Sequence, residues 1–226
     1  MSAIDASRSG GNALRAAAAT FLVAATMAVS TPALGQGMFG PGKFKIEHID
    51  DRFSTSPTTM VIGHNNRVTK KSPVGGIYIN SQGLYLNPVM VKSRADGKVV
   101  RIGFVIENRT ELDTTYGSPN SLGSLSRVGF LINGTLLIPG TVTAAEQRFA
   151  DRIDYNTISR SASSRLNESG MVYLTTSDMA ALAGATSVAI QVQGSARLWT
   201  IEDKDVAKTF IANVRAFYEQ QVAAAS

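Results

Sequence analysis

The chain has 226 residues, of which 44% are hydrophobic and 17% are charged, and its formal net charge is +5. This length and composition suit one globular domain with a core of its own. The basic residues are scattered, whereas a nucleic-acid-binding protein needs a basic stripe, so we expect no nucleic-acid partner. The chain contains no cysteine, which excludes disulfides, thiolate catalysis and cysteine-ligated metals.

Residues 1–35 have the pattern of a secretory signal peptide. Two arginines precede an apolar run over residues 16–29, and the small residues Ala33 and Gly35 mark a cleavage site. The run is shorter than the ~20 residues that cross a bilayer. We therefore expect a bacterial periplasmic or secreted protein that is cleaved near Gly35 and has no transmembrane segment in its mature chain.

Residues 36–42 are rich in glycine and should form a flexible lead-in to a single domain over residues 43–226. Alternating apolar and polar residues then predict strands over residues 43–51 and 58–64. The lysines of the first strand are typical of a sheet edge, because they discourage pairing with other chains.

The segment from residue 75 to 88 repeats a short motif, IYIN and then LYLN, which predicts a hairpin with Tyr78 opposite Tyr85. Paired aromatic side chains on an exposed sheet can bind a flat or sugar-like ligand. They can equally be a cross-strand pair that only stabilises the hairpin.

The clearest strand is Val99–Asn108. With a period of two, Val100, Ile102, Phe104 and Ile106 fall on one face, and polar residues alternate with small apolar ones on the other. One face of this strand should therefore be buried and the other partly wet.

A long polar loop is expected over residues 108–126, followed by a strand over residues 127–138 that ends at Pro139. The region 143–165 is ambiguous. Residues 144–150 have the composition of a short helix, and the serine-rich residues 159–164 resemble a loop.

Towards the end of the chain, Thr175 and Asp178 have the spacing of a capping box, which predicts a short helix over residues 177–183. Three short strands should flank it, over residues 171–174, 186–193 and 197–201. Apolar residues at helical spacing predict an amphipathic C-terminal helix over residues 202–222. Its apolar stripe should cover the sheet, with docking to a membrane or partner as the alternative.

No catalytic motif is evident: the G-x-S-x-G elbow, the P-loop and the dinucleotide glycine pattern are all missing. The two histidines do not make a metal site, so no cofactor is expected. Glu107, Glu111 and Asp113 lie near the long loop and could act in a carboxylate-dependent hydrolase. They could also simply keep the loop soluble.

These patterns predict an antiparallel β-sandwich of about eight strands with a short helix and a C-terminal amphipathic helix. The first functional hypothesis is a non-catalytic protein that binds another protein or a cell-envelope component, in an unspecified oligomeric state. The second is a small-ligand or carbohydrate-binding protein, and the third is the hydrolase. The candidate site residues are Tyr78, Tyr85, Trp199, Tyr116, Glu107, Glu111 and Asp113.

Overall fold

Antiparallel strands make up most of the described chain. The computed structural model describes residues 42–50, 55–79 and 81–225, so the expected signal peptide and nearly all of the expected lead-in lie outside the described residues. The strands are β1 (Lys45–Ile49), β2 (Thr58–His64), β3 (Arg67–Thr69), β4 (Gly83–Ser93), β5 (Val99–Asp113), β6 (Leu125–Ile132), β7 (Leu136–Asn156), β8 (Ser161–Leu174), β9 (Val188–Gly194) and β10 (Leu198–Ile201).

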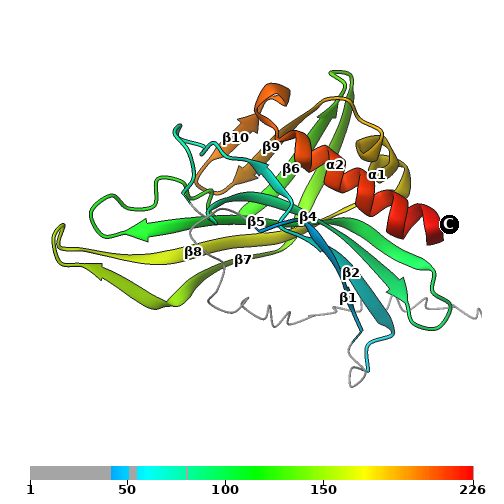
Figure 1. Cartoon of the computed structure of the whole chain (residues 1–226), viewed down its shortest axis with the longest axis horizontal. Coiled ribbons are helices and arrows are strands. Elements are labelled where there is room, and N and C mark those ends of the chain that lie inside the picture. The colour runs from blue at the N-terminus through cyan, green and yellow to red at the C-terminus, as the bar shows by residue number, and fades with distance from the viewer. Residues whose placement is uncertain (1–41, 51–54, 80, 226) are drawn as a thin grey trace, which may run out of the picture. The chain divides into compact units, whose positions relative to one another are not determined.

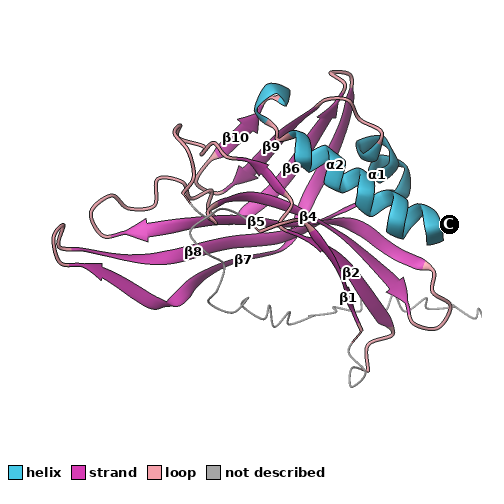
Figure 2. Ribbon diagram, in the orientation of Figure 1, coloured by secondary structure: helices cyan, strands magenta, loops and turns pink. Residues whose placement is uncertain are grey.

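The helices are α1 (Thr176–Ala183) and α2 (Lys208–Phe217), and they lie beside each other (Figure 2). Single turns of 3₁₀-helix occur at Asp203–Asp205 and Ala223–Ala225, and a π-helical turn at Tyr218–Val222. Within the described ranges, no helix combines the length and apolarity that a membrane span requires.

All the strands belong to one antiparallel sheet in the order β1-β2-β4-β5-β8-β7-β6-β9-β10, with β3 paired to β4 (Figure 1). Neighbouring strands are ~4.8 Å apart, so a flat sheet would hold β5 and β6 about 14 Å apart. Yet the rings of Phe104 on β5 and Phe130 on β6 are only 5.5 Å apart. The sheet therefore bends back on itself.

A mainly β, antiparallel fold is thus confirmed, but a sandwich of two separate sheets is not. β7 is the reason, because it pairs with β6 through its first residues and with β8 through the rest. The two layers are therefore joined by hydrogen bonds within one continuous sheet.

The prediction for the central strand is largely confirmed. Ile102, Phe104 and Ile106 of β5 are buried on one face, which we call the core face. Val100 is exposed, because a bulge shifts the pairing of β4 with β5 at that end.

The predicted capping box is also confirmed. The Thr175 hydroxyl accepts a hydrogen bond from the Asp178 N–H and the Asp178 carboxylate accepts one from the Thr175 N–H, so α1 begins with a capping box. The C-terminal helix is shorter than expected, since the chain is extended at Val206 and Ala207 before α2 begins. Its apolar stripe covers the protein's own core, and the ring centres of Phe210 and Phe104 are 6.4 Å apart.

The expected hairpin of residues 75–88 is wrong. Tyr85 lies opposite Arg67 of β3 on one side and Glu107 of β5 on the other, and Tyr78 instead donates its N–H to the Lys70 carbonyl. The repeat suggested a local partner for β4. This strand is buried from Gly83 to Met90, and it takes its partners from both sides of the sheet.

The expected helix over residues 144–150 is also wrong, because these residues lie within β7. Ala144 has a φ of 50°, which interrupts any helix there, and β7 bulges between Thr143 and Glu146. Pro139 does not end its strand, since β7 is paired only with β6 at that point. The strand instead turns earlier, at Asn133-Gly134, a typical hairpin turn with positive φ at both residues.

Candidate functional site

The core face of the sheet extends past the residues that form the hydrophobic core. Residues that lie opposite each other in an antiparallel pair share a face, so Ile106, Asn108, Thr110 and Leu112 follow one another along the core face of β5. Gly170, Glu168, Leu166 and Ser164 lie opposite them on β8. Helices cover the first part of this face, a loop covers the middle, and the last part is open.

The covering loop, residues 118–124, is held down by one buried carboxylate. Glu168 is fully buried. Its two oxygens accept hydrogen bonds from Asn108 Nδ2 (2.7 Å), Leu122 N (2.8 Å), Gly123 N (2.8 Å), Gln147 Nε2 (3.1 Å) and the Ser121 hydroxyl. These donors balance the cost of burying the charge and fix Leu122 in the core.

Tyr78 extends this network. Its hydroxyl donates to Asn108 Oδ1 at 2.9 Å, and Asn108 in turn donates to Glu168 and to the Asn120 carbonyl. Burial raises the pKa of the Tyr78 phenol, and the negative charge of Glu168 raises it further. The phenol is therefore a neutral hydrogen-bond donor inside the fold.

Beyond the covering loop, β7 and β8 reach past β9 and β10 as a long hairpin beside the end of β5 (Figure 1). We call residues 110–117 and 149–165 the arm. On the core face of the arm lie Leu112, Phe149, Ile153 and Tyr155, which we call the apolar strip.

The apolar strip is open to solvent. Leu112 is 38% exposed, Phe149 57%, Ile153 70% and Tyr155 64%. With roughly 200 Å² for each large side chain, the strip exposes about 450 Å² of mainly apolar surface. That lies among the largest patches of soluble monomers, which are often functional.

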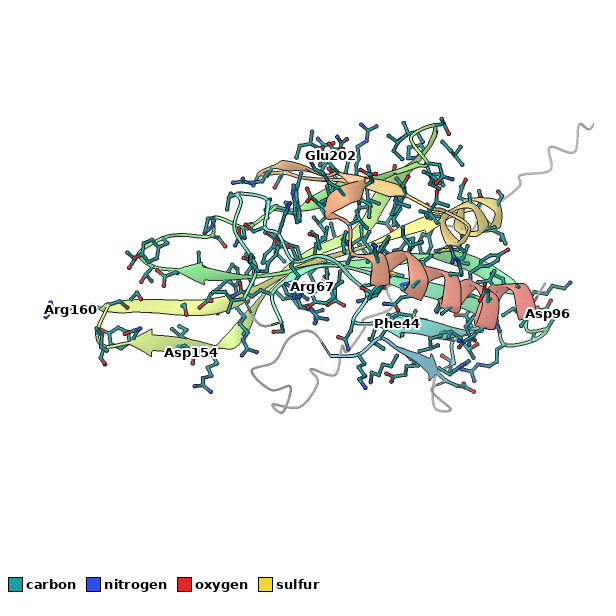
Figure 3. The ribbon with its side chains drawn as sticks, turned by 45° about the horizontal axis from the view of Figure 1, so that its top comes forward. Phe44, Arg67, Asp96, Asp154, Arg160 and Glu202 are labelled. Carbon is teal, nitrogen blue, oxygen red and sulfur yellow. The ribbon has the colours of Figure 1, made fainter. Side chains whose placement is uncertain are left out.

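The end of the arm brings two loops together. Thr114 N donates to the Ala162 carbonyl at 2.9 Å, and Ala162 N donates to the Thr114 hydroxyl at 2.9 Å. Tyr116 is 78% exposed on one loop, and Ile158, at the turn between β7 and β8, is 95% exposed. Arg160 lies at the end of the same turn (Figure 3).

The opposite face of the sheet, which we call the polar face, carries a paired charge cluster. Tyr85 is buried, with the Arg109 guanidinium 4.3 Å from its ring centre and that of Arg67 6.0 Å away. Arg109 Nε donates to Glu107 Oε2 at 2.7 Å, and Asn87 Nδ2 donates to Glu107 Oε1 at 3.1 Å. Burial raises the pKa of the Tyr85 phenol although the two guanidiniums oppose this shift.

His64 lies on the polar face. Its Nε2 atom is 3.2 Å from Glu47 Oε2 but makes no hydrogen bond. Burial lowers the pKa of the imidazole; Glu47 and Glu107 oppose this shift, whereas Lys45 and Arg109 add to it. The folded state therefore binds the proton less readily than the unfolded chain, and protonation favours unfolding as pH falls below about 6.5.

We expect the free energy of unfolding to fall more steeply between pH 7.5 and 5.5 in the parent protein than in His64→Gln. Urea unfolding at several pH values measures both curves. Because every other titrating group is common to the two proteins, their difference isolates His64. Parallel curves would contradict the lowered pKa.

The structure separates the candidate aromatic residues. Tyr78 and Trp199 are buried together on the core side, with ring centres 6.4 Å apart, whereas Tyr85 is buried on the polar face. These three rings therefore do not share an exposed surface, and Tyr116 is the exposed aromatic residue of the predicted set.

The candidate carboxylates have separate partners. Glu107 pairs with Arg109, Glu111 accepts from Gln82 Nε2 at 3.0 Å, and Asp113 accepts from the N–H groups of Thr115 and Tyr116. Glu107 and Glu111 are four residues apart on one strand, so their Cα atoms are about 13 Å apart. The described residues contain no group of three metal-binding side chains.

Two cavities lie elsewhere. One, of about 240 Å³, is lined by residues of α1 and the C-terminal helix, including Ala183 and Arg215. The other, of about 320 Å³, is lined by residues that include Asn133 and Glu202. None of the candidate residues lines either cavity, and no residue of the arm does so.

The sequence interpretation missed the apolar strip and Ile158. Ile153 and Tyr155 do alternate with polar residues, as a strand requires. That signal was too short to be recognised beside the helix-like residues 144–150. Glu168 was missed as well, because nothing in its local sequence distinguishes a buried glutamate from an exposed one.

No protein-family model, curated protein or solved structure matches this chain.

Proposed function

We propose that this chain is a non-catalytic, exported protein of the bacterial periplasm or secreted fraction that binds a protein or an envelope component through its arm. The observation that carries the proposal is the apolar strip, which continues the core face beyond its cover. Large apolar side chains in solvent forgo the stabilisation that burial would give them. A binding partner that covers the strip would supply that burial.

The rest of the fold suits this role. In this proposal the bent sheet acts as a sandwich-like scaffold, and the hydrogen bonds of Glu168 hold the base of the arm in place. Arg148 pairs with Glu146 and Arg152 pairs with Asp154, each at 2.7 Å. These four charges, two just before the arm and two within it, cancel in pairs, which lowers the cost of covering the strip.

Photo-crosslinking in the producing bacterium tests the proposal. We expect benzoylphenylalanine at Ile153 to give discrete covalent adducts, with protein or with lipid, in the envelope or secreted fraction. The matched control is the same substitution at Ile77, an isoleucine that is 75% exposed but lies in a loop outside the arm. Adducts from Ile153 that are no more abundant than those from Ile77 would refute the arm as a binding surface.

A further inference from the structure

The arm ends in a small, exposed apolar tip. Ile158 is almost fully exposed at the turn, with Tyr116 on the neighbouring loop and Tyr155 on the strand that leads to it. Tyrosine has an apolar ring and a polar hydroxyl, a combination that suits the boundary between water and lipid. The tip therefore has the residue types of a segment that enters a bilayer surface.

The charges at the tip agree with this. Asp154 is paired with Arg152, and the Asp113 carboxylate is bound by the N–H groups of Thr115 and Tyr116. Among the described side chains Arg160 makes no ion pair, and it projects from the end of the hairpin (Figure 3). A guanidinium in this position matches a lipid phosphate.

The area of the apolar strip argues against a second copy as the occupant. Two strips of about 450 Å² each would bury about 900 Å² in total, below the ~1,200–2,000 Å² of stable protein–protein interfaces. A bilayer has no such threshold, since interfacial binding grows with the apolar area inserted and with attraction to anionic lipids. Self-association through the strip alone would therefore be weak, whereas the strip and the tip can both enter a lipid surface.

We propose that the arm docks on the surface of a phospholipid bilayer. Ile158, Ile153 and Tyr155 enter the boundary between headgroups and acyl chains, and the Arg160 guanidinium binds a lipid phosphate. This inference rests on the proposed function, because it names the envelope component that the arm binds.

The cysteine-free chain allows a local test. Ile158→Cys, labelled with an environment-sensitive dye in the otherwise unchanged full chain, should show a several-fold rise and a blue shift in emission on vesicles of phosphatidylcholine and phosphatidylglycerol. The matched control is Ile77→Cys with the same dye, which should not respond. Because the dye reports only its own surroundings, binding of the expected signal peptide to the vesicles does not produce the signal.

Arg160 allows a second test. Arg160→Gln should weaken the apparent affinity of the labelled tip for these vesicles about five-fold, the effect of one basic residue near an anionic surface. Arg160→Lys should restore most of it. No response from position 158 at millimolar lipid, or an equal response from position 77, would overturn the lipid proposal.

The two proposals fail in different ways. Protein adducts from Ile153 in cells, together with a silent dye at position 158, would refute the bilayer and keep the binding function. A response at position 158 that is lost in Ile153→Asp supports the bilayer. Absence of both adducts and dye response would refute both proposals.

Discussion

Replacing Glu168 with alanine is expected to lower the free energy of unfolding by about 4 kcal/mol. The substitution removes the acceptor of five donors inside the fold, among them the backbone N–H groups of Leu122 and Gly123. A buried donor without a partner costs about 1–3 kcal/mol, and loop relaxation can let water reach only some of these groups. Glu168→Gln keeps one oxygen but turns an amide towards the donors, and we expect it to cost about 2 kcal/mol.

Urea unfolding measures these differences, and Glu146→Ala is the matched control. Glu146 lies on β7 and pairs with Arg148 at a half-exposed site, so its loss should cost less than about 1 kcal/mol. Hydrogen exchange adds a local readout, since the amides of Leu122 and Gly123 should lose protection in Glu168→Ala. A loss of less than 1 kcal/mol in Glu168→Ala would show that the covering loop is held by other contacts.

Local pattern was enough to predict several elements of this fold. The strand predicted over residues 58–64 has the bounds of β2, and the capping box at Thr175 and Asp178 begins α1 as expected. In both cases the signal is confined to neighbouring residues: a period of two in the strand, and a hydroxyl and a carboxylate three residues apart at the helix.

Pairing across the sheet could not be predicted in the same way. The repeat that contains Tyr78 and Tyr85 made a local hairpin the simplest interpretation, but Tyr85 pairs with Glu107, which is distant in sequence. Residues 144–150 have helix-forming composition, yet the ladder with β8 and the positive φ of Ala144 place them in a strand. Strand propensity depends on its partners, and the sequence does not name them.

The candidate site shows the same contrast between local patterns and contacts distant in sequence. Tyr116 lies in the segment whose polar composition predicts a loop, and it is exposed at the end of the arm. The apolar strip depends on where the cover of the core face stops. That boundary is set by Glu168 and the covering loop, which meet only in the folded chain.

The contrast between Phe104 and Phe149 tests this boundary directly. Both are phenylalanines on the core face, but Phe104 is fully buried against Phe130 and Phe210, whereas Phe149 is open to solvent. We expect Phe104→Ala to lower the free energy of unfolding by about 4 kcal/mol, because it leaves a cavity where β5, β6 and α2 meet. Phe149→Ala should cost about 0.5 kcal/mol or less, since little buried surface is lost.

Urea unfolding of the two variants gives the stability difference, and crosslinking from Ile153 gives the functional one. Phe149→Ala should fold like the parent protein and yet lose most of the adducts formed at Ile153, because its ring is part of the apolar strip. If Phe149→Ala instead destabilises the fold as much as Phe104→Ala does, the strip belongs to the core of this protein. A partner could then not bind the strip, and the binding surface would have to lie elsewhere.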